Sequence, residues 1–285
     1  MPPSIGGCQV FPADNPWNTP VASSPVHPRS AAFISSIQAT GSNNLHPDFG
    51  ENPAYGIPYV VVPEGEPLVP ITYDAFGDES DPGPFPVPLD APIEGVSGAT
   101  TGDRHAIALR RGTCELFELY LARPGAVGWT AASGARFDLR SNDLRPLGWT
   151  SADAAGLPIL PGLVRYEEVA AGQIRHAIRV TFSRTQRGFV LPATHFASRH
   201  TDPDLPPMGL RLRMRSEVDL SGVTGQALVI ADAMKEYGLI VADNGSNWFF
   251  QGAPHPGWND ADLDQLKSIP GTAFEVVDTG PIVTG

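Results

Sequence analysis

A histidine and a glutamate in the segment DRHAIALRRGTCELFELY, residues 103–120, are spaced so that a β-hairpin would bring them together. The segment predicts two alternating strands that reverse at Arg111-Gly112. A tight turn centred there places His105 directly opposite Glu118 on one face of the hairpin. Side chains so placed have Cβ atoms about 5 Å apart, so each group would shift the pKa of the other. Such a pair could transfer protons near neutral pH, although a purely structural polar pair also fits the pattern.

The same register places Asp103 opposite Tyr120, so that one end of this face gathers further polar groups. Hydrolysis of a glycosidic bond needs two carboxyl groups that flank the bond. We expect Glu118 to be the first of these catalytic groups, with His105 tuning it through a hydrogen bond. Either Asp153 or Asp103 would supply the second carboxyl group.

Asp153 belongs to the segment GWTSADAAGLPILPG, residues 148–162, which combines an aromatic side chain with several hydrogen-bonding groups. A local explanation is sufficient for this pattern. Thr150 or Ser151 could cap one helical turn that Gly156 ends, and Asp153 would then only complement the helix dipole. The functional alternative makes Asp153 a catalytic carboxylate beside an aromatic platform.

Four aromatic or imidazole side chains are candidates for holding a substrate. Aromatic rings at the edge of a polar groove commonly stack on sugar rings. Tyr120 lies at the polar end of the hairpin, Trp149 and Trp248 lie close to turns, and His195 follows a strand-like run. Burial in the core is the alternative for each tryptophan.

Two other classes of function remain open. The first is a lectin-like carbohydrate-binding module without catalysis, in which Trp149 and Trp248 would hold the sugar. The second is a metal-dependent enzyme, in which His105 and Glu118 would join His195 or His176 as ligands. Because no HExxH, HxH or CxxC pattern is present, we predict no bound metal from the motifs.

The sequence also contains no GxGxxG, no P-loop and no GxSxG motif, so it predicts neither a nucleotide cofactor nor a serine-hydrolase elbow. The acidic loop that carries Glu79 and Asp81 could bind Ca²⁺, and a solvated loop is the simpler interpretation. No other cofactor is expected.

The composition limits the partners. The chain has 285 residues, 41% of them hydrophobic, and a formal net charge of −12. Without a basic stripe, nucleic acid and anionic membrane surfaces are poor partners, and no run of 18 apolar residues predicts a membrane span. We therefore expect a polysaccharide or oligosaccharide partner.

Two features favour export. Cys8 and Cys114 are the only cysteines, and we predict that they form a disulfide, with two unrelated buried thiols as the alternative. Lysine is scarce, since only Lys235 and Lys267 occur. The first residues lack the basic and apolar regions of a signal peptide, which fits either a cytosolic protein or a mature form. Because of the two features above, we expect a mature extracellular or periplasmic form.

Short strands and many turns set the fold class, because Gly and Pro number 30 each. The segments with strand signatures are 59–62, 69–73, 105–110, 115–122, 135–139, 163–168, 176–182, 189–191 and 210–220. Asn244-Gly245 predicts a two-residue hairpin turn that pairs Val241 with Trp248.

Helices are expected over residues 30–41, 224–237 and 259–269. Together these elements predict a mainly β fold, of β-sandwich or jelly-roll type, with two or three short peripheral helices. We expect an extended N-terminal arm over residues 1–29 and a single β-rich domain over residues 30–285.

Overall fold

The structure is a computed structural model that describes residues 1–95 and 100–284. About 16% of the chain is helical and 26% is in strands, so the prediction of a mainly β fold with short helices is confirmed. The α-helices are α1 (Ser30–Gln38), α2 (Tyr166–Ala170), α3 (Gly225–Glu236) and α4 (Asp260–Asp264). The 3₁₀ turns are η1 (Gly77–Glu79), η2 (Leu160–Gly162), η3 (Gln265–Ser268) and η4 (Gly271–Ala273).

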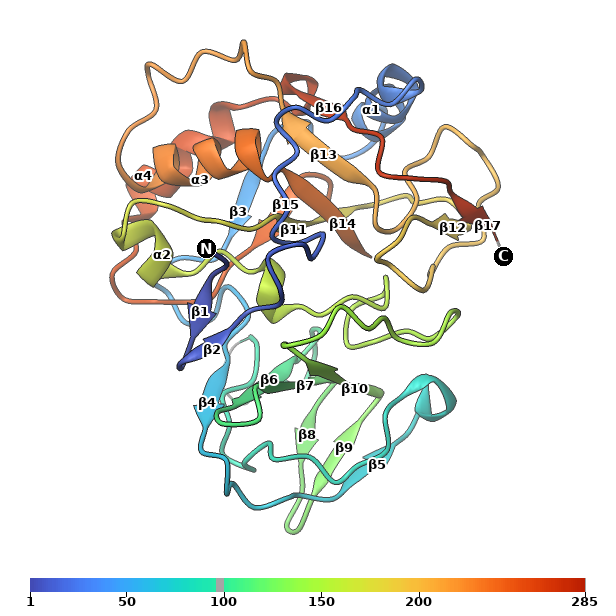
Figure 1. Cartoon of the computed structure of the whole chain (residues 1–285), viewed down its shortest axis with the longest axis vertical. Coiled ribbons are helices and arrows are strands. Elements are labelled where there is room, and N and C mark those ends of the chain that lie inside the picture. The colour runs from blue at the N-terminus through green and yellow to red at the C-terminus, as the bar shows by residue number, and fades with distance from the viewer. Residues whose placement is uncertain (96–99, 285) are drawn as a thin grey trace.

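The strands form two larger sheets and three smaller ones (Figure 1). The six-stranded sheet has the order β16 (Phe274–Val276), β13 (Arg211–Met214), β14 (Leu239–Asn244), β11 (Ile178–Phe182), β15 (Phe249–Gln251) and β3 (His46–Asp48). The four-stranded sheet has the order β10 (Ser133–Asp138), β7 (Glu115–Tyr120), β6 (Ala106–Arg110) and β4 (Val60–Val62).

The smaller sheets have two or three strands each. A three-stranded sheet has the order β5 (Ile71–Tyr73), β9 (Trp129–Ala131) and β8 (Arg123–Pro124). The two-stranded sheets are β1 (Ser4–Ile5) with β2 (Cys8–Gln9), and β12 (Gly188–Phe189) with β17 (Val283–Thr284). None of the helices in the described residues is long and apolar enough to cross a membrane.

The four-stranded sheet separates two hydrophobic cores. Because side chains alternate along a strand, Ile107 and Leu109 enter the larger core, whereas Ala108 and Phe117 enter the smaller one. The larger core also takes in the apolar side chains of the six-stranded sheet, α1 and α3, and the smaller core includes Trp129 of β9. One face of the hairpin β6–β7 therefore looks toward the six-stranded sheet, as Figure 1 shows in outline.

The hairpin keeps the predicted face but not the predicted register. Ile107 lies opposite Glu118, and Leu109 lies opposite Leu116. The predicted pairing of His105 with Glu118 is therefore wrong by two residues. A shift of two residues leaves every side chain on the same face of the hairpin. The faces of the side chains were therefore predicted correctly even though their partners were not.

The conformation of the turn explains the shift. Gly112 has φ +80° and Cys114 has φ +53°, so two residues of the reversal adopt the left-handed conformation. The chain turns through residues 111–114 rather than through Arg111-Gly112 alone, and Cys114 leaves the ladder. The predicted Cys8–Cys114 disulfide is confirmed, with a Cα–Cα distance of 5.4 Å.

Three other local predictions are wrong. Residues 163–168, expected as a strand, follow the 3₁₀ turn η2 and lead into α2, with Glu167 in its first turn. The expected strand over residues 210–220 is only the four-residue β13. No hairpin forms at Asn244-Gly245, because β11 lies between β14 and β15 and pairs with both.

Residues 1–29 contain little regular structure beyond β1 and β2, yet they contribute to the larger core. Val10 and Trp17 are at most 1% exposed, and the Asn18 side chain donates to the carbonyl of Val10 at 2.8 Å. The disulfide joins this segment to the β6–β7 turn, so the N-terminal residues brace the four-stranded sheet.

Removing the disulfide should lower the free energy of unfolding. The bridge joins positions separated by 106 residues, and a loop of that length predicts a loss of about 4–5 kcal/mol in the variant C8S/C114S. Urea denaturation of the variant and of the wild type, each with and without reductant, measures this loss. Equal midpoints for the oxidised wild type and the variant would contradict the bracing role.

Candidate functional site

A layer of polar side chains lies between the two larger sheets. Arg179 on β11 donates from Nη1 to the Oε1 atom of Gln251 on β15 at 2.5 Å. Gln251 is paired in register with Asp48 on β3, and a hydrogen bond joins their side chains. The row therefore crosses three neighbouring strands inside an otherwise apolar region.

Arg179 and Asp153 form the central ion pair of this layer. The guanidinium donates from Nε to Asp153 Oδ2 at 3.0 Å and from Nη2 to Oδ1 at 2.6 Å. The Asp153 and Arg179 side chains are 0% and 3% exposed. Burial alone would lower the pKa of Arg179, but the Asp153 charge outweighs burial and raises this pKa. The pair is therefore ionised.

Asp243 is the second carboxyl group at this position. The register of β11 against β14 shifts between Val180 and Thr181, and this β-bulge brings Asp243 beside Asp153. Burial first, and then the Asp153 charge and a hydrogen bond with Asp153, raise the pKa of Asp243 well above its ordinary value of 3.8. Two adjacent carboxyl groups cannot both ionise cheaply, so Asp243 keeps a proton and donates it to Asp153.

The loop that carries Asp153 is held by side chains rather than by helical hydrogen bonds. The predicted helical turn is absent, because the Ser151 hydroxyl accepts from the Asp153 N–H at 2.9 Å and donates to the Leu157 carbonyl at 2.6 Å. The carbonyls of residues 149, 150, 151, 152 and 154 accept from the side chains of Thr194, Arg145, Ser133, His105 and His195, respectively.

His105 acts on this loop from the four-stranded sheet. Its Nδ1 atom lies 2.5 Å from Glu94 Oε2, and its Nε2 atom donates to the Ala152 carbonyl at 3.0 Å. Burial lowers the pKa of His105, but the Glu94 carboxylate outweighs it and raises the pKa to about 9. The imidazolium therefore fixes the backbone next to Asp153, and its ring contacts Tyr120 rather than Glu118, with centroids 5.7 Å apart.

Glu118 holds the other end of the same loop. Its two carboxylate oxygens accept from the Ile159 N–H at 2.9–3.0 Å, and Oε1 also accepts from the Leu160 N–H at 2.9 Å. Burial raises the pKa of Glu118 to about 7, against the lowering effect of these backbone donors. Because Glu118 is 0% exposed, it lies behind the loop and not at a surface that a solute reaches.

A pocket of about 600 Å³ opens beside the carboxyl pair. Asp153, Asp243, Tyr120 and His195 line it, together with polar groups from residues 150 and 151 and the aromatic side chains of Phe76 and Phe196. Asp243 is partly exposed, whereas Asp153 is buried behind it. Three of the residues predicted from the sequence thus come together here: Asp153, Tyr120 and His195.

Other predicted site residues lie outside this pocket's lining. Asp103 is exposed on the chain before β6. Trp149 is half-buried with the Arg145 guanidinium 5.7 Å from its ring. Trp248 is 0% exposed and packs edge-on against Phe182 in the core.

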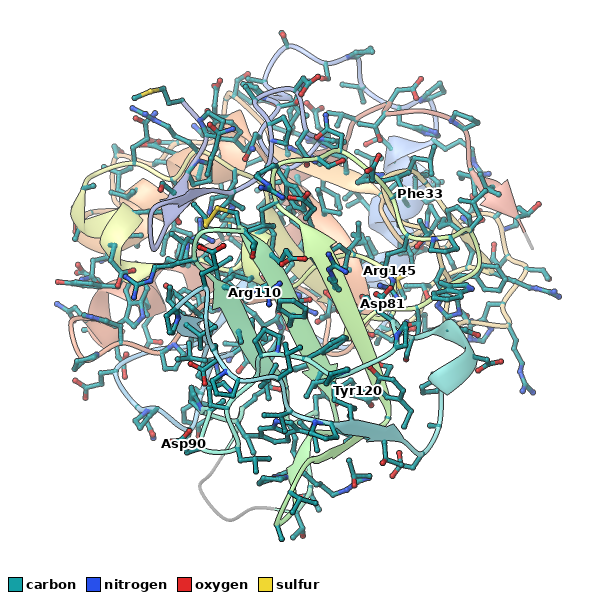
Figure 2. The ribbon with its side chains drawn as sticks, turned by 60° about the horizontal axis from the view of Figure 1, so that its bottom comes forward. Phe33, Asp81, Asp90, Arg110, Tyr120 and Arg145 are labelled. Atoms are coloured by element: carbon teal, nitrogen blue, oxygen red, sulfur yellow. A yellow bond between two sulfur atoms is a disulfide. The ribbon has the colours of Figure 1, made fainter. Side chains whose placement is uncertain are left out.

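The acidic loop is held by an arginine. Arg145 pairs with Asp81, as Figure 2 shows, and Glu79 accepts from the Thr150 N–H at 3.1 Å. His195 lies 3.7 Å from Glu79, so this loop supports one wall of the pocket. Within residues 1–95 and 100–284, no group of three His, Cys, Asp or Glu side chains could hold a metal ion.

His176, the other candidate ligand, is 0% exposed and contacts Glu168 at 3.1 Å.

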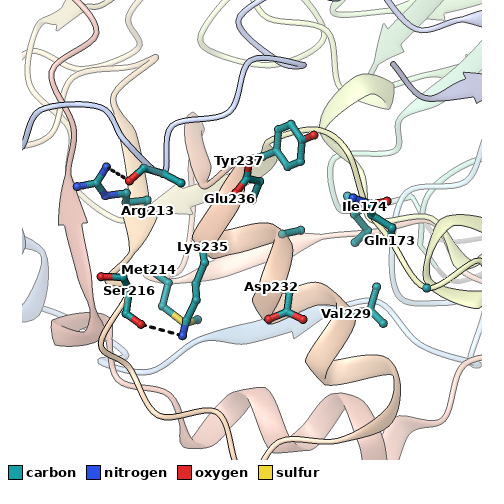
Figure 3. Close-up of a pocket in the computed structure, with 13 residues that line it drawn as sticks. Gln173, Ile174, Arg213, Met214, Ser216, Val229, Asp232, Lys235, Glu236 and Tyr237 are labelled. Carbon is teal, nitrogen blue, oxygen red and sulfur yellow. Dashed lines mark hydrogen bonds between the residues drawn. The ribbon is translucent and has the colours of Figure 1, made fainter. Parts of the chain in front are cut away.

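A second groove, of about 540 Å³, lies along the C-terminal half of α3 (Figure 3). Its cations are bound to the protein backbone: Lys235 donates to the carbonyls of Ser216 and Val218, and Arg213 donates to the carbonyls of Val21 and Ala22. These cations hold the surrounding loops and are not free to bind a ligand. The lining of this groove does not include the hydrogen-bonded acid pair Asp153–Asp243.

Sequence reasoning missed Arg179 and Asp243. A signal for Arg179 was present, since it is a lone charge inside the strand HAIRVTF. Comparison of the chain with protein-family models, curated proteins and solved structures returned no match. The functional argument therefore rests on the geometry of this pocket.

Replacing each member of the carboxyl pair should affect stability differently. D153N removes the carboxylate that accepts two hydrogen bonds from the buried Arg179 guanidinium and should lower the free energy of unfolding by about 3–5 kcal/mol. D243N replaces a carboxyl group that already donates a hydrogen bond, so the loss should be about 1 kcal/mol or less. Urea denaturation at pH 7 measures both, and equal losses would contradict the assignment of the proton to Asp243.

His105 should stabilise the fold in a pH-dependent way. Because its pKa rises from 6.5 to about 9 on folding, its contribution is fully present below pH 6.5 and is lost as the pH rises through 9. The difference in the free energy of unfolding between wild type and H105Q should therefore shrink between pH 6 and pH 10. A difference that stays constant over this range would show that His105 is not charged.

Proposed function

We propose that the pocket is the active site of an exported glycoside hydrolase in which Asp243 is the proton donor. The observation that carries this proposal is the hydrogen-bonded pair of carboxyl groups on the pocket wall, one buried and ion-paired, the other partly exposed and raised in pKa. A carboxyl group whose pKa is raised above its ordinary value, so that it keeps its proton to higher pH, is what general acid catalysis of glycosidic cleavage requires.

Each side chain has a defined part in this reaction. Asp243 gives its proton to the glycosidic oxygen as the bond from that oxygen to the anomeric carbon breaks, and the alcohol leaves. Water then adds to the anomeric carbon and returns a proton to Asp243. The ionised Asp153 favours this return, because two adjacent negative carboxylates repel each other.

Asp153 acts in this scheme as a positioning residue, since it lies behind Asp243. The two carboxyl groups are in hydrogen-bond contact, closer than the roughly 5 Å or more that separates carboxyl groups flanking a glycosidic bond. Glu118 and His105 position the loop of Asp153 from opposite ends.

Two further features fit a saccharide in an extracellular setting. Tyr120, Phe76 and Phe196 give the pocket aromatic walls beside hydroxyl-bearing residues, the combination that sugars need for stacking and hydrogen bonding. The Cys8–Cys114 disulfide is typical of exported proteins.

A screen for reducing ends released from soluble polysaccharides tests the activity, with D243N and D103N assayed beside the wild type. D243N should lower the rate by about 10²–10⁴-fold because the proton donor is lost. D103N should keep the wild-type rate, since Asp103 is exposed and does not line the pocket. The wild-type rate should fall as the pH rises through the raised pKa of Asp243.

Release that is unchanged in D243N, or equally reduced in D103N, would contradict the assignment. Binding of a glycan without release by the wild type would favour the lectin-like alternative over the hydrolase.

A further inference from the structure

Exposed arginines gather at one rim of the proposed active site. Arg199 lines the pocket, and the guanidinium of Arg187 lies 5.7 Å from the ring of Phe196, which also lines it. A β-bridge between Gln186 and His200 and a hydrogen bond from the Arg187 N–H to the His200 carbonyl at 2.6 Å join the two segments. The bridge therefore brings side chains far apart in the sequence to one edge.

These cations have no acidic partner among the described residues. Arg187 and Arg199 are exposed, and neither takes part in an ion pair within residues 1–95 and 100–284. The nearby acids of the loop have other partners, because Asp204 pairs with Arg29 at 2.5 Å and Asp202 accepts from the Asp204 N–H at 3.0 Å. Arg184, exposed and three residues before Arg187, adds to the same segment.

This placement is unusual for so acidic a chain. Lys and Arg together number 19 against 31 Asp and Glu, yet unpaired arginines stand beside the one pocket that holds the carboxyl pair. Inside the pocket the carboxyl charges are neutralised, Asp153 by Arg179 and Asp243 by its proton. An anion entering past Arg199 would therefore meet the guanidinium groups of the rim, and guanidinium groups bind carboxylates and sulfates through paired hydrogen bonds.

We propose that the substrate is an anionic saccharide, whose carboxylate or sulfate group binds Arg187 and Arg199 while a glycosidic oxygen lies at Asp243. That this saccharide is hydrolysed rests on the proposed function, whereas the binding of the saccharide to the pocket does not. The negative group would be on a sugar unit next to the cleaved bond, because Arg199 and Asp243 line the same pocket.

Binding can be measured separately from cleavage by using D243N, which keeps the pocket and lacks the proton donor. Isothermal titration with three size-matched oligosaccharides, one of uronic acids, one sulfated and one neutral, identifies the recognised group. We expect an anionic ligand to bind at least tenfold more tightly than the neutral one, with an affinity that falls as salt is added. The two anionic arms distinguish carboxylate from sulfate recognition.

Removing the rim cations should abolish this preference. In the D243N background, R187Q/R199Q should weaken binding of the anionic ligand about tenfold or more and leave binding of the neutral ligand unchanged. R111Q is the matched control, because Arg111 is an exposed arginine in the β6–β7 turn and does not line the pocket. It should leave both affinities unchanged.

Equal affinity for neutral and anionic ligands, or an equal effect of R111Q, would overturn the inference. Tight anionic binding by D243N together with no cleavage by the wild type would overturn the proposed hydrolase and leave the inference intact. Cleavage of neutral glycans that is insensitive to R187Q/R199Q would overturn the inference of an anionic substrate and leave the proposed hydrolase intact.

Discussion

The buried guanidinium of Arg179 is the constraint on which the site depends. A charge enclosed between two sheets is costly unless a counter-charge and hydrogen bonds surround it. Asp153 supplies the counter-charge through two hydrogen bonds, and Gln251 satisfies a further donor. The ionised Asp153 then lies beside Asp243, and burial of Asp243 first and the Asp153 charge second raise the pKa of Asp243 well above its ordinary value, against the lowering effect of the Arg179 charge.

The rest of the polar layer keeps Asp153 in this position. Its loop lacks helical hydrogen bonds, so side chains from both sheets bind its backbone. His105 and Glu118 make two of these contacts, and both come from the hairpin that the sequence singled out. In the proposed function, the hairpin residues position the reacting group rather than react themselves, because they lie behind the loop.

Side-chain alternation made the hairpin predictable, whereas its register depended on the turn. Two left-handed residues, Gly112 and Cys114, lengthen the reversal, and nothing in their sequence pattern distinguishes this turn from a tighter one. The disulfide was predicted only because the chain has two cysteines. The failed hairpin at Asn244-Gly245 shows the same limit, since a local turn signal does not reveal that β11 will insert between the flanking strands.

The residues of the site could be predicted only in part, because the sequence does not show which strands pair with each other. Asp153, Tyr120 and His195 stood out by residue type, but the parallel pairing and bulge of β14 against β11 place Asp243. The sequence did not predict the basic rim either, because a β-bridge between Gln186 and His200 joins the segments that carry Arg187 and Arg199. Periodicity identifies faces of strands, and it carries no information on which strands become neighbours.

The central claim is that burial and the adjacent Asp153 carboxylate raise the pKa of Asp243 well above its ordinary value. Carbon-13 NMR of protein labelled at the aspartate side-chain carboxyl carbons, followed through a pH titration, tests it most directly. Burial also raises the pKa of Asp48, so the account predicts, beside the Asp48 resonance, a second aspartate resonance whose titration midpoint lies well above the ordinary 3.8 and which disappears in D243N. A spectrum in which D243N removes no elevated resonance, or in which all aspartates titrate in the ordinary range, would contradict it.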